Sequence, residues 1–193
     1  MFYCCIRIEC LILYITNQNV ELEFYVSGFS LNGGTEKQTG ILFVLICIAF
    51  NIINVWMEEG VFRGLFAKFL ESISYIKVVF LIAFLFGVWH WVMPFRDYLE
   101  GKSSLQTLLI MGIGYIVLAG IMSIKWSLLY KLTGSLWMGL GDHLFNNVIV
   151  TNLVHVISNN EADGMQIVRI LIGQLISFTI VLLFYIKNNK RTR

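Results

Sequence analysis

Residues 104–124 read SLQTLLIMGIGYIVLAGIMSI and contain no side chain that is charged at neutral pH. A helix that crosses a hydrocarbon core of about 30 Å needs about 20 predominantly apolar residues, which is the length of this stretch. The whole chain of 193 residues is 58% hydrophobic and only 13% charged, which is far more apolar than a soluble domain of this length. The sequence therefore predicts a membrane protein.

Four more apolar runs have a comparable length, and each of them predicts a membrane span. Backbone groups without hydrogen bonds are costly in lipid, so apolar runs of this length favour helices over a barrel. We therefore expect an all-α fold, a polytopic transmembrane helical bundle of about six helices. The four runs lie at residues 39–57, 75–94, 134–157 and 165–187.

Charged residues at the chain ends suggest the domain organisation. Residues 1–38 are apolar but interrupted by charges, so we expect one marginal or interfacial membrane helix there. Residues 39–187 form the predicted transmembrane core, and residues 188–193 form a basic tail. Because cytoplasmic segments are enriched in lysine and arginine, we expect a cytoplasmic C-terminus, an inner loop at 125–131 and an outer loop at 95–102.

Composition gives weaker information about partners and redox state. A net charge of +2 says little about partners, and we expect membrane lipid but no nucleic acid. The cysteines lack the paired spacing of a metal site and have apolar neighbours, so we expect buried free thiols. They are Cys4, Cys5, Cys10 and Cys47.

Three ionisable residues follow the first core run, in VWMEEGVFRGL at residues 55–65. Charged groups in membrane segments are costly, so they are functional hypotheses by default. Glu59 and Arg63 are four residues apart, which favours an ion pair on one helix face, and Glu58 points about 100° away from that face. The alternative is that both carboxylates flank a helix end at the membrane interface.

Two other spans carry polar groups. His90 lies in FLFGVWHWVMP, where a lone histidine is more often structural than functional. GSLWMGLGDHLFNN places Asp142, His143 and Asn147 in the middle of a predicted span, with His143 and Asn147 on one helix face. We interpret His155, near the outer end of the same span, as structural or interfacial.

The polar groups of these spans satisfy one another only if they converge inside the bundle. A carboxylate or imidazole can then take a proton from water, and an amide with a second imidazole can hold an oxyanion. The set therefore favours hydrolysis inside a membrane bundle. The same residue types are also typical of a catalytic zinc site, with Glu58, His90 and His143 as candidate ligands. The spacing of the residues does not distinguish a metal-free site from a zinc site. The common HExxH signature is absent.

Three short motifs resemble one known family. EEGVFRG at 58–64 is similar to an EExxxR motif, FGVWH at 86–90 to FxxxH, and HLFNN at 143–147 to HxxxN. In this order and spacing they resemble the CPBP family, which comprises CAAX prenyl endopeptidases and bacteriocin-processing or Abi-type intramembrane proteases. The resemblance covers about residues 40–155 with motif content.

The resemblance implies that Glu58 acts on water together with His90, and that His143 and Asn147 complete the site. It implies that Glu59 is the buried partner of Arg63. Zinc and a metal-free glutamate mechanism both stay open, so the protein is expected to be either a metalloprotease or a glutamate-dependent hydrolase.

Peptide or prenylated, lipid-associated polypeptides are the implied substrates, and the small single domain favours bacterial peptide processing or bacteriocin self-immunity in the plasma membrane. The alternative is a non-catalytic immunity or binding protein, or a proton or ion pathway. The predicted span ends create one conflict with this site. They place Glu58 near the inner end of its helix and His90 near the outer end of the next helix.

Overall fold

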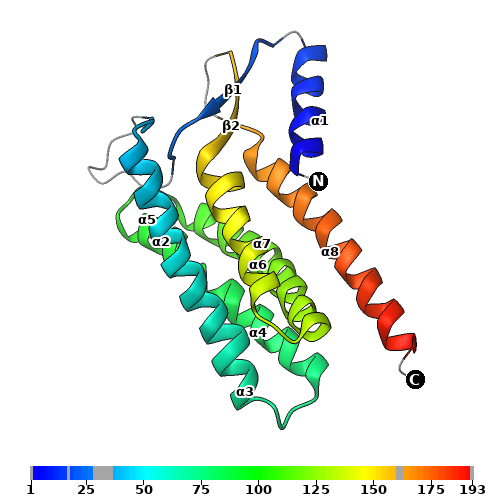
Figure 1. The fold of residues 1–193 in the computed structure, drawn as a ribbon. Helices are drawn as coiled ribbons and strands as arrows, with labels where there is room; N and C mark the ends of the chain where they lie inside the picture. The colour runs from blue at the N-terminus through cyan, green and yellow to red at the C-terminus, as the bar shows by residue number, and fades with distance from the viewer. Residues whose placement is uncertain (1, 17, 28–36, 160–162, 192–193) are drawn as a thin grey trace. The chain divides into compact units, whose positions relative to one another are not determined.

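The computed structural model describes residues 2–16, 18–27, 37–159 and 163–191, and it is predominantly helical (Figure 1). Several helices continue directly into one another, so the described residues form six helical segments and one pair of short strands. In chain order, the elements are α1 (Phe2–Ile15), β1 (Val20–Phe24), α2 (Ile41–Glu59), η1 (Gly60–Phe66), α3 (Ala67–Phe69), α4 (Tyr75–Trp89), α5 (Val92–Leu99), α6 (Leu105–Thr133), α7 (Trp137–Phe145), η2 (Asn146–Leu153), β2 (Val154–Ser158) and α8 (Gln166–Arg191).

Four helices in the described residues are long and apolar enough to cross a membrane: Ile41–Phe69, Tyr75–Leu99, Leu105–Thr133 and Gln166–Lys190. They overlap the predicted spans at 39–57, 75–94, 104–124 and 165–187, and they support an integral membrane protein with an all-α bundle.

The predicted span at 134–157 is wrong in its last residues. The helix made by α7 and η2 ends at Leu153, and Val154–Ser158 continue as strand β2. This strand pairs antiparallel with β1, from Val20 opposite Ser158 to Phe24 opposite Val154. Its valine and isoleucine side chains suit an extended backbone, and the hydrogen bonds come from a segment that is distant in sequence.

Two predicted loops are also wrong. Residues 125–131 belong to α6, which runs to Thr133, and Lys125 is fully buried in that helix. In the predicted loop at 95–102, helix α5 continues to Leu99. The prediction from hydropathy ended these helices too early because it treated charged residues as helix boundaries. A helix continues as long as its backbone is hydrogen-bonded.

The chain divides into two compact units, which are described separately. The first unit comprises residues 1–57 and 140–177, and the second comprises 58–139 and 178–193. In the first unit, β1 and β2 pair beside α1 (Figure 1). Ile6 and Leu13 of α1 pack there with Val154 and Val156 of β2 in a small apolar core.

The first unit also contains a buried charge cluster. Arg169 of α8 donates hydrogen bonds to Glu9 of α1 and to Asp163, with 2.5 Å between the bonded atoms in each case. His155 stacks on Tyr25 at 3.9 Å between ring centroids and is buried, as a structural histidine would be. All four cysteines are free, but Cys4 is exposed, which corrects the expectation that every thiol is buried.

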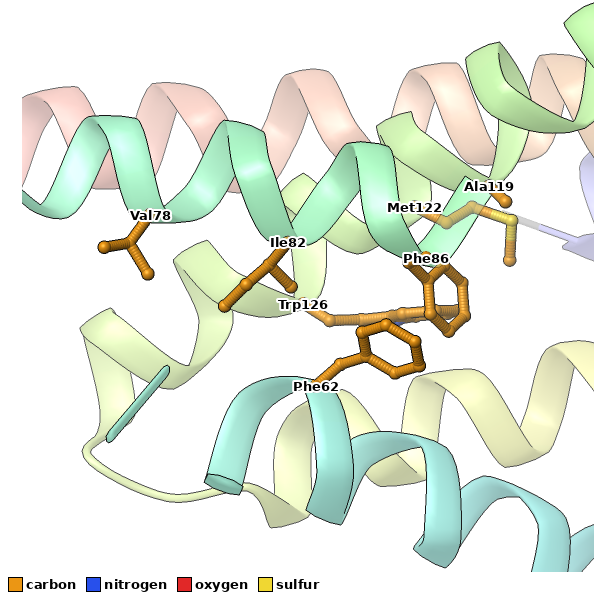
Figure 2. Close-up of a cluster of buried hydrophobic side chains, with 7 residues drawn as sticks. All are labelled: Phe62, Val78, Ile82, Phe86, Ala119, Met122 and Trp126. Carbon is orange, nitrogen blue, oxygen red and sulfur yellow. The ribbon is translucent and has the colours of Figure 1, made fainter. Parts of the chain in front are cut away.

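The second unit has its core between α4, α6 and η1. Figure 2 shows Phe62 of η1 directed toward Phe86 of α4 and Trp126 of α6. Helices α4 and α6 run antiparallel, and Tyr75 at the start of α4 donates a hydrogen bond to the carbonyl of Ser127 near the end of α6. Arg63 of the predicted site lies over the Phe86 and Trp126 rings of this core.

Candidate active site

The first motif lies in the middle of a long helix rather than at its end. The helix that begins at Ile41 continues through η1 to Phe69, and Glu58 and Glu59 are the last residues of its α-helical part. From Gly60 to Phe66 the backbone is a π-helix, a geometry that occurs frequently at functional sites. Apolar residues therefore continue on both sides of the two carboxylates.

The ion pair predicted from the spacing is present. Arg63 Nη1 donates to Glu59 Oε1 at 3.2 Å, and each of the two side chains is 1% exposed. The guanidinium also lies over the rings of Phe86 and Trp126, at 4.5 and 5.1 Å from their centroids. Aromatic faces attract cations, so these rings compensate part of the cost of burying the charge.

Glu58 points away from this pair, as its position on the helix predicts. Its side chain is 4% exposed, and its Oε1 accepts a hydrogen bond from Trp89 Nε1 at 3.1 Å. Trp89 ends α4 and directly precedes His90, so Glu58 lies beside the second motif. The predicted separation of Glu58 from His90 is therefore wrong, because the Glu58 helix extends well beyond residue 57.

His90 lies in the short turn between α4 and α5. Its Nδ1 is 2.8 Å from the carbonyl oxygen of Phe86, which can only accept a hydrogen bond. Nδ1 must therefore carry the hydrogen in a neutral ring, and Nε2 carries the lone pair. The ring also stacks on Tyr115 of α6, with 6.0 Å between centroids. His90 thus presents a basic nitrogen with a defined orientation.

The third motif lies in the first unit. His143 is buried in α7, and Asn147 is half-buried at the start of η2. The Asn147 carbonyl accepts a hydrogen bond from Asn152 Nδ2 at 2.7 Å, and its side-chain Oδ1 accepts from Asn146 Nδ2 at 3.4 Å. Like η1, η2 is a π-helix, so the backbone leaves α geometry within both motifs.

The structure brings four predicted site residues together in the second unit and places two in the first. The second unit contains Glu58, Glu59, Arg63 and His90, and the first contains His143 and Asn147. Sequence reasoning missed Trp89, although it belongs to the quoted FGVWH stretch. Tryptophan is common near the ends of membrane spans, so nothing in the sequence marked it as a partner of Glu58.

A model of the type II CAAX prenyl endopeptidase Rce1-like family matches residues 40–149, more than half of the chain. The chain belongs to this family. It is a family of CAAX-type proteases, which act on prenylated peptides at membranes. The search of curated proteins and the search of solved structures each found no match.

The matched region of this Rce1-like protein contains all three motifs, since it begins before Glu58 and ends after Asn147. Membership supports the predicted protease class and the CAAX resemblance. The catalytic role of each residue stays a prediction.

A metal site needs several side chains that can bind a cation. In the ranges that the structure describes, no group of three or more histidine, cysteine, aspartate or glutamate side chains is arranged to hold a metal ion. Catalytic zinc generally has three protein ligands. Zinc binding by Glu58, His90 and His143 stays a prediction.

Proposed function

We propose that this Rce1-like protein is an intramembrane endopeptidase in which Glu58 and His90 activate the attacking water. One observation supports this most directly. Trp89 binds the buried Glu58 carboxylate at 3.1 Å and is the chain neighbour of His90, whose Nε2 carries a lone pair. Glu58 and the segment that carries His90 are thus joined through Trp89 within the second unit.

In the proposed reaction, Glu58 takes a proton from water as the water oxygen bonds to the scissile carbonyl carbon. His90 orients this water through Nε2. The carbonyl oxygen gains negative charge, and we assign its stabilisation to His143 and Asn147. The carbon–nitrogen bond then breaks, and Glu58 returns the proton to the leaving amine.

The low dielectric of the site strengthens these contacts. Glu59 directly follows Glu58, and its buried ion pair with Arg63 holds a compensated charge beside that residue. We assign it a positioning role, because the two side chains bind each other and the guanidinium also lies over aromatic rings.

The proposed substrate is a prenylated or otherwise membrane-associated polypeptide. A role in bacterial peptide processing or bacteriocin self-immunity is the proposed biological setting. The purified protein can be incubated with a prenylated CAAX peptide and, separately, with an unprenylated bacteriocin precursor. Mass spectrometry of the products then shows which of the two candidate substrates is cleaved.

The residue roles are tested by substitution. Glu58→Gln and His90→Gln should each reduce kcat by about 100- to 10,000-fold, the usual contribution of general acid–base catalysis. His143→Ala and Asn147→Ala should reduce it by about 100- to 1,000-fold as oxyanion donors. Thermal unfolding of each variant in micelles checks that the fold persists.

Glu100→Gln is a matched control, because Glu100 is an exposed carboxylate just after α5. It should keep full activity. Undiminished cleavage by folded Glu58→Gln protein would refute the proposed mechanism. Cleavage that a chelator abolishes and zinc restores would assign the reaction to a metal instead.

A further inference from the structure

Four helix ends of the second unit lie together. Tyr75 at the start of α4 donates a hydrogen bond to the carbonyl of Ser127 near the end of α6. The Tyr75 ring also lies 6.4 Å from the ring of Tyr185, near the end of α8. Helix α3 ends there as well, because Ala67 lines the same cavity as Tyr75. The second unit therefore has one end at which α3, α4, α6 and α8 meet.

Tyrosines place this end at the level of the lipid headgroups. Each of the four helices belongs to a segment that is long and apolar enough to cross a membrane. Tyrosine is enriched where such segments leave the hydrocarbon, because its ring is apolar and its hydroxyl is polar. Three tyrosines lie at this end of the unit, namely Tyr75, Tyr130 and Tyr185.

Lysines gather at the same level, and we call this surface the basic end. The Nζ of Lys131 lies 5.2 Å from the centroid of the Tyr75 ring. Of the carboxylates that the structure describes in the second unit, only Glu71 lies here, in the loop at 70–74. Five lysines against one carboxylate leave a net charge of +4. All five are exposed, and they are Lys68, Lys77, Lys131, Lys187 and Lys190.

The opposite end of the same unit has balanced charges. Arg96 lies 3.4 Å from Asp97 and 3.7 Å from Glu100, and Lys102 also pairs with Glu100. Two cations and two carboxylates therefore neutralise each other there. In the ranges that the structure describes, none of the five lysines of the basic end forms an ion pair with a carboxylate. The positive charge of the second unit is thus concentrated at one membrane end.

Uncompensated positive charge at headgroup depth fits an anionic lipid surface. Each lysine near such a surface adds to the attraction, and long lysine side chains can extend from a helix end to the headgroups. A zwitterionic headgroup has no net charge, so it gains less from the same lysines. The expected ligand is therefore an anionic phospholipid.

We propose that the basic end binds the headgroups of anionic phospholipids, with the lysines on the phosphates and the tyrosines at the boundary with the acyl chains. Lipid binding of this kind does not rest on the proposed cleavage of peptides.

Native mass spectrometry of the intact protein tests the proposal. The protein is placed in nanodiscs that contain equal amounts of phosphatidylglycerol and phosphatidylcholine with identical acyl chains, and the lipids retained after release are identified. Phosphatidylglycerol should be retained about 5- to 50-fold more often than phosphatidylcholine. This preference should fall as the ammonium acetate concentration is raised, because salt screens exposed charges.

Variants connect the preference to the basic end. Lys77→Gln and Lys131→Gln should each lower it by about 3- to 5-fold, since each removes one cation near the headgroups. Replacing all five lysines by glutamine should make the retention of the two lipids equal, and thermal unfolding checks that this variant is folded. Lys102→Gln is the matched control, because it removes the same charge from the balanced end, and it should keep the preference.

Equal retention of the two lipids by the unsubstituted protein would overturn the proposal, and so would a preference that survives in the variant without the five lysines. If Lys102→Gln lowered the preference as much as Lys131→Gln, the overall charge of the protein would explain it and the proposed surface would be refuted. Soluble glycerol phosphate should not displace the lipid. Displacement would assign the lysines to a free phosphate instead of a membrane surface.

Discussion

At the scale of single residues, the Glu59–Arg63 pair shows how a charge is tolerated inside this protein. Both side chains are almost completely buried, and the guanidinium is surrounded by aromatic rings. Removing one partner of a buried pair leaves the other charge uncompensated, which costs far more than the pair contributes.

Arg63→Gln alone should therefore lower the free energy of unfolding by about 3–5 kcal/mol. The double variant Glu59→Gln with Arg63→Gln should lose less than Arg63→Gln, because no charge is left behind. Denaturant titration in micelles measures both variants. Equal losses in the two proteins would show that the carboxylate of Glu59 is compensated in another way.

The hydrogen bond from Trp89 to Glu58 gives a second residue-scale prediction. Trp89→Phe keeps an aromatic ring but removes the Nε1 donor, so Glu58 loses one orienting contact. We expect kcat to fall about 10-fold, with little change in stability because Trp89 is 46% exposed. Trp56→Phe, at another exposed tryptophan, is the matched control. Similar activity in both variants would remove Trp89 from the site.

At the scale of helices, the contact between α4 and α6 depends on the absence of a side chain at Gly87. A Cβ atom there would lie 2.6 Å from the Cα of Ile116, which is backbone and cannot move aside. The close approach of the two helices holds Phe86 and the following turn with His90 against α6.

Gly87→Ala should lower the free energy of unfolding by about 1–3 kcal/mol, the usual cost of overpacking. Gly114→Ala is the matched control, because a Cβ atom at Gly114 would meet nothing within 4 Å. It should be neutral or stabilise the helix by about 0.5–1 kcal/mol. A stable Gly87→Ala protein would mean that the helices separate at little cost.

The π-helices η1 and η2 are the other element-scale feature. They begin directly after Glu59 and after Phe145, so each begins within a motif that carries predicted site residues. In η2, Asn152 Nδ2 donates to the carbonyl of Asn147 five residues earlier, and Thr151 Oγ1 donates to Asn146 in the same way. Side chains thus support the widened backbone beside the candidate site.

At the scale of the whole chain, Glu9 and Arg169 join segments that are 160 residues apart in sequence. Burial raises the pKa of Glu9 above its ordinary value of 4.5, and the hydrogen bond from Arg169 opposes this shift only in part. The folded protein therefore holds this proton at a higher pH than the unfolded chain does. Its stability should fall as the pH rises from about 4.5 through the folded pKa.

Glu9→Gln removes this titration, so its free energy of unfolding should depend less on pH in that range. Arg169 keeps Asp163 as a partner in the variant, which protects the fold. Denaturant titrations at several pH values compare the two proteins. If the stability of Glu9→Gln and of the unsubstituted protein depended on pH identically, Glu9 would have the same proton affinity in the folded and unfolded states.

Orientation in the membrane gives the last prediction. The loop at 70–74 and the loop at 100–104 lie at opposite ends of α4 and α5, and the basic C-terminal tail is predicted to be cytoplasmic. With the four native cysteines replaced by alanine, Ser72→Cys should react with an impermeant maleimide only from the cytoplasm. Lys102→Cys should react only from the outside, and the reverse pattern would invert the topology.

Much of this protein follows from local sequence. Hydropathy determined the membrane class and four of its spans, because a helix in lipid satisfies its own backbone and needs only sufficient apolar length. Helical spacing determined the pairing of Glu59 with Arg63 and the separate direction of Glu58, since both depend on residues within one turn.

Tertiary structure decided what depends on partners far along the chain. It turned Val154–Ser158 into a strand, because β1 supplies the hydrogen bonds that a fifth full span would have made internally. Tertiary structure also continued α6 past Lys125. It placed Trp89 against Glu58 by packing α4 beside the helix that begins at Ile41. Hydropathy and periodicity describe one segment at a time, so contacts between distant segments appear only when the chain is packed.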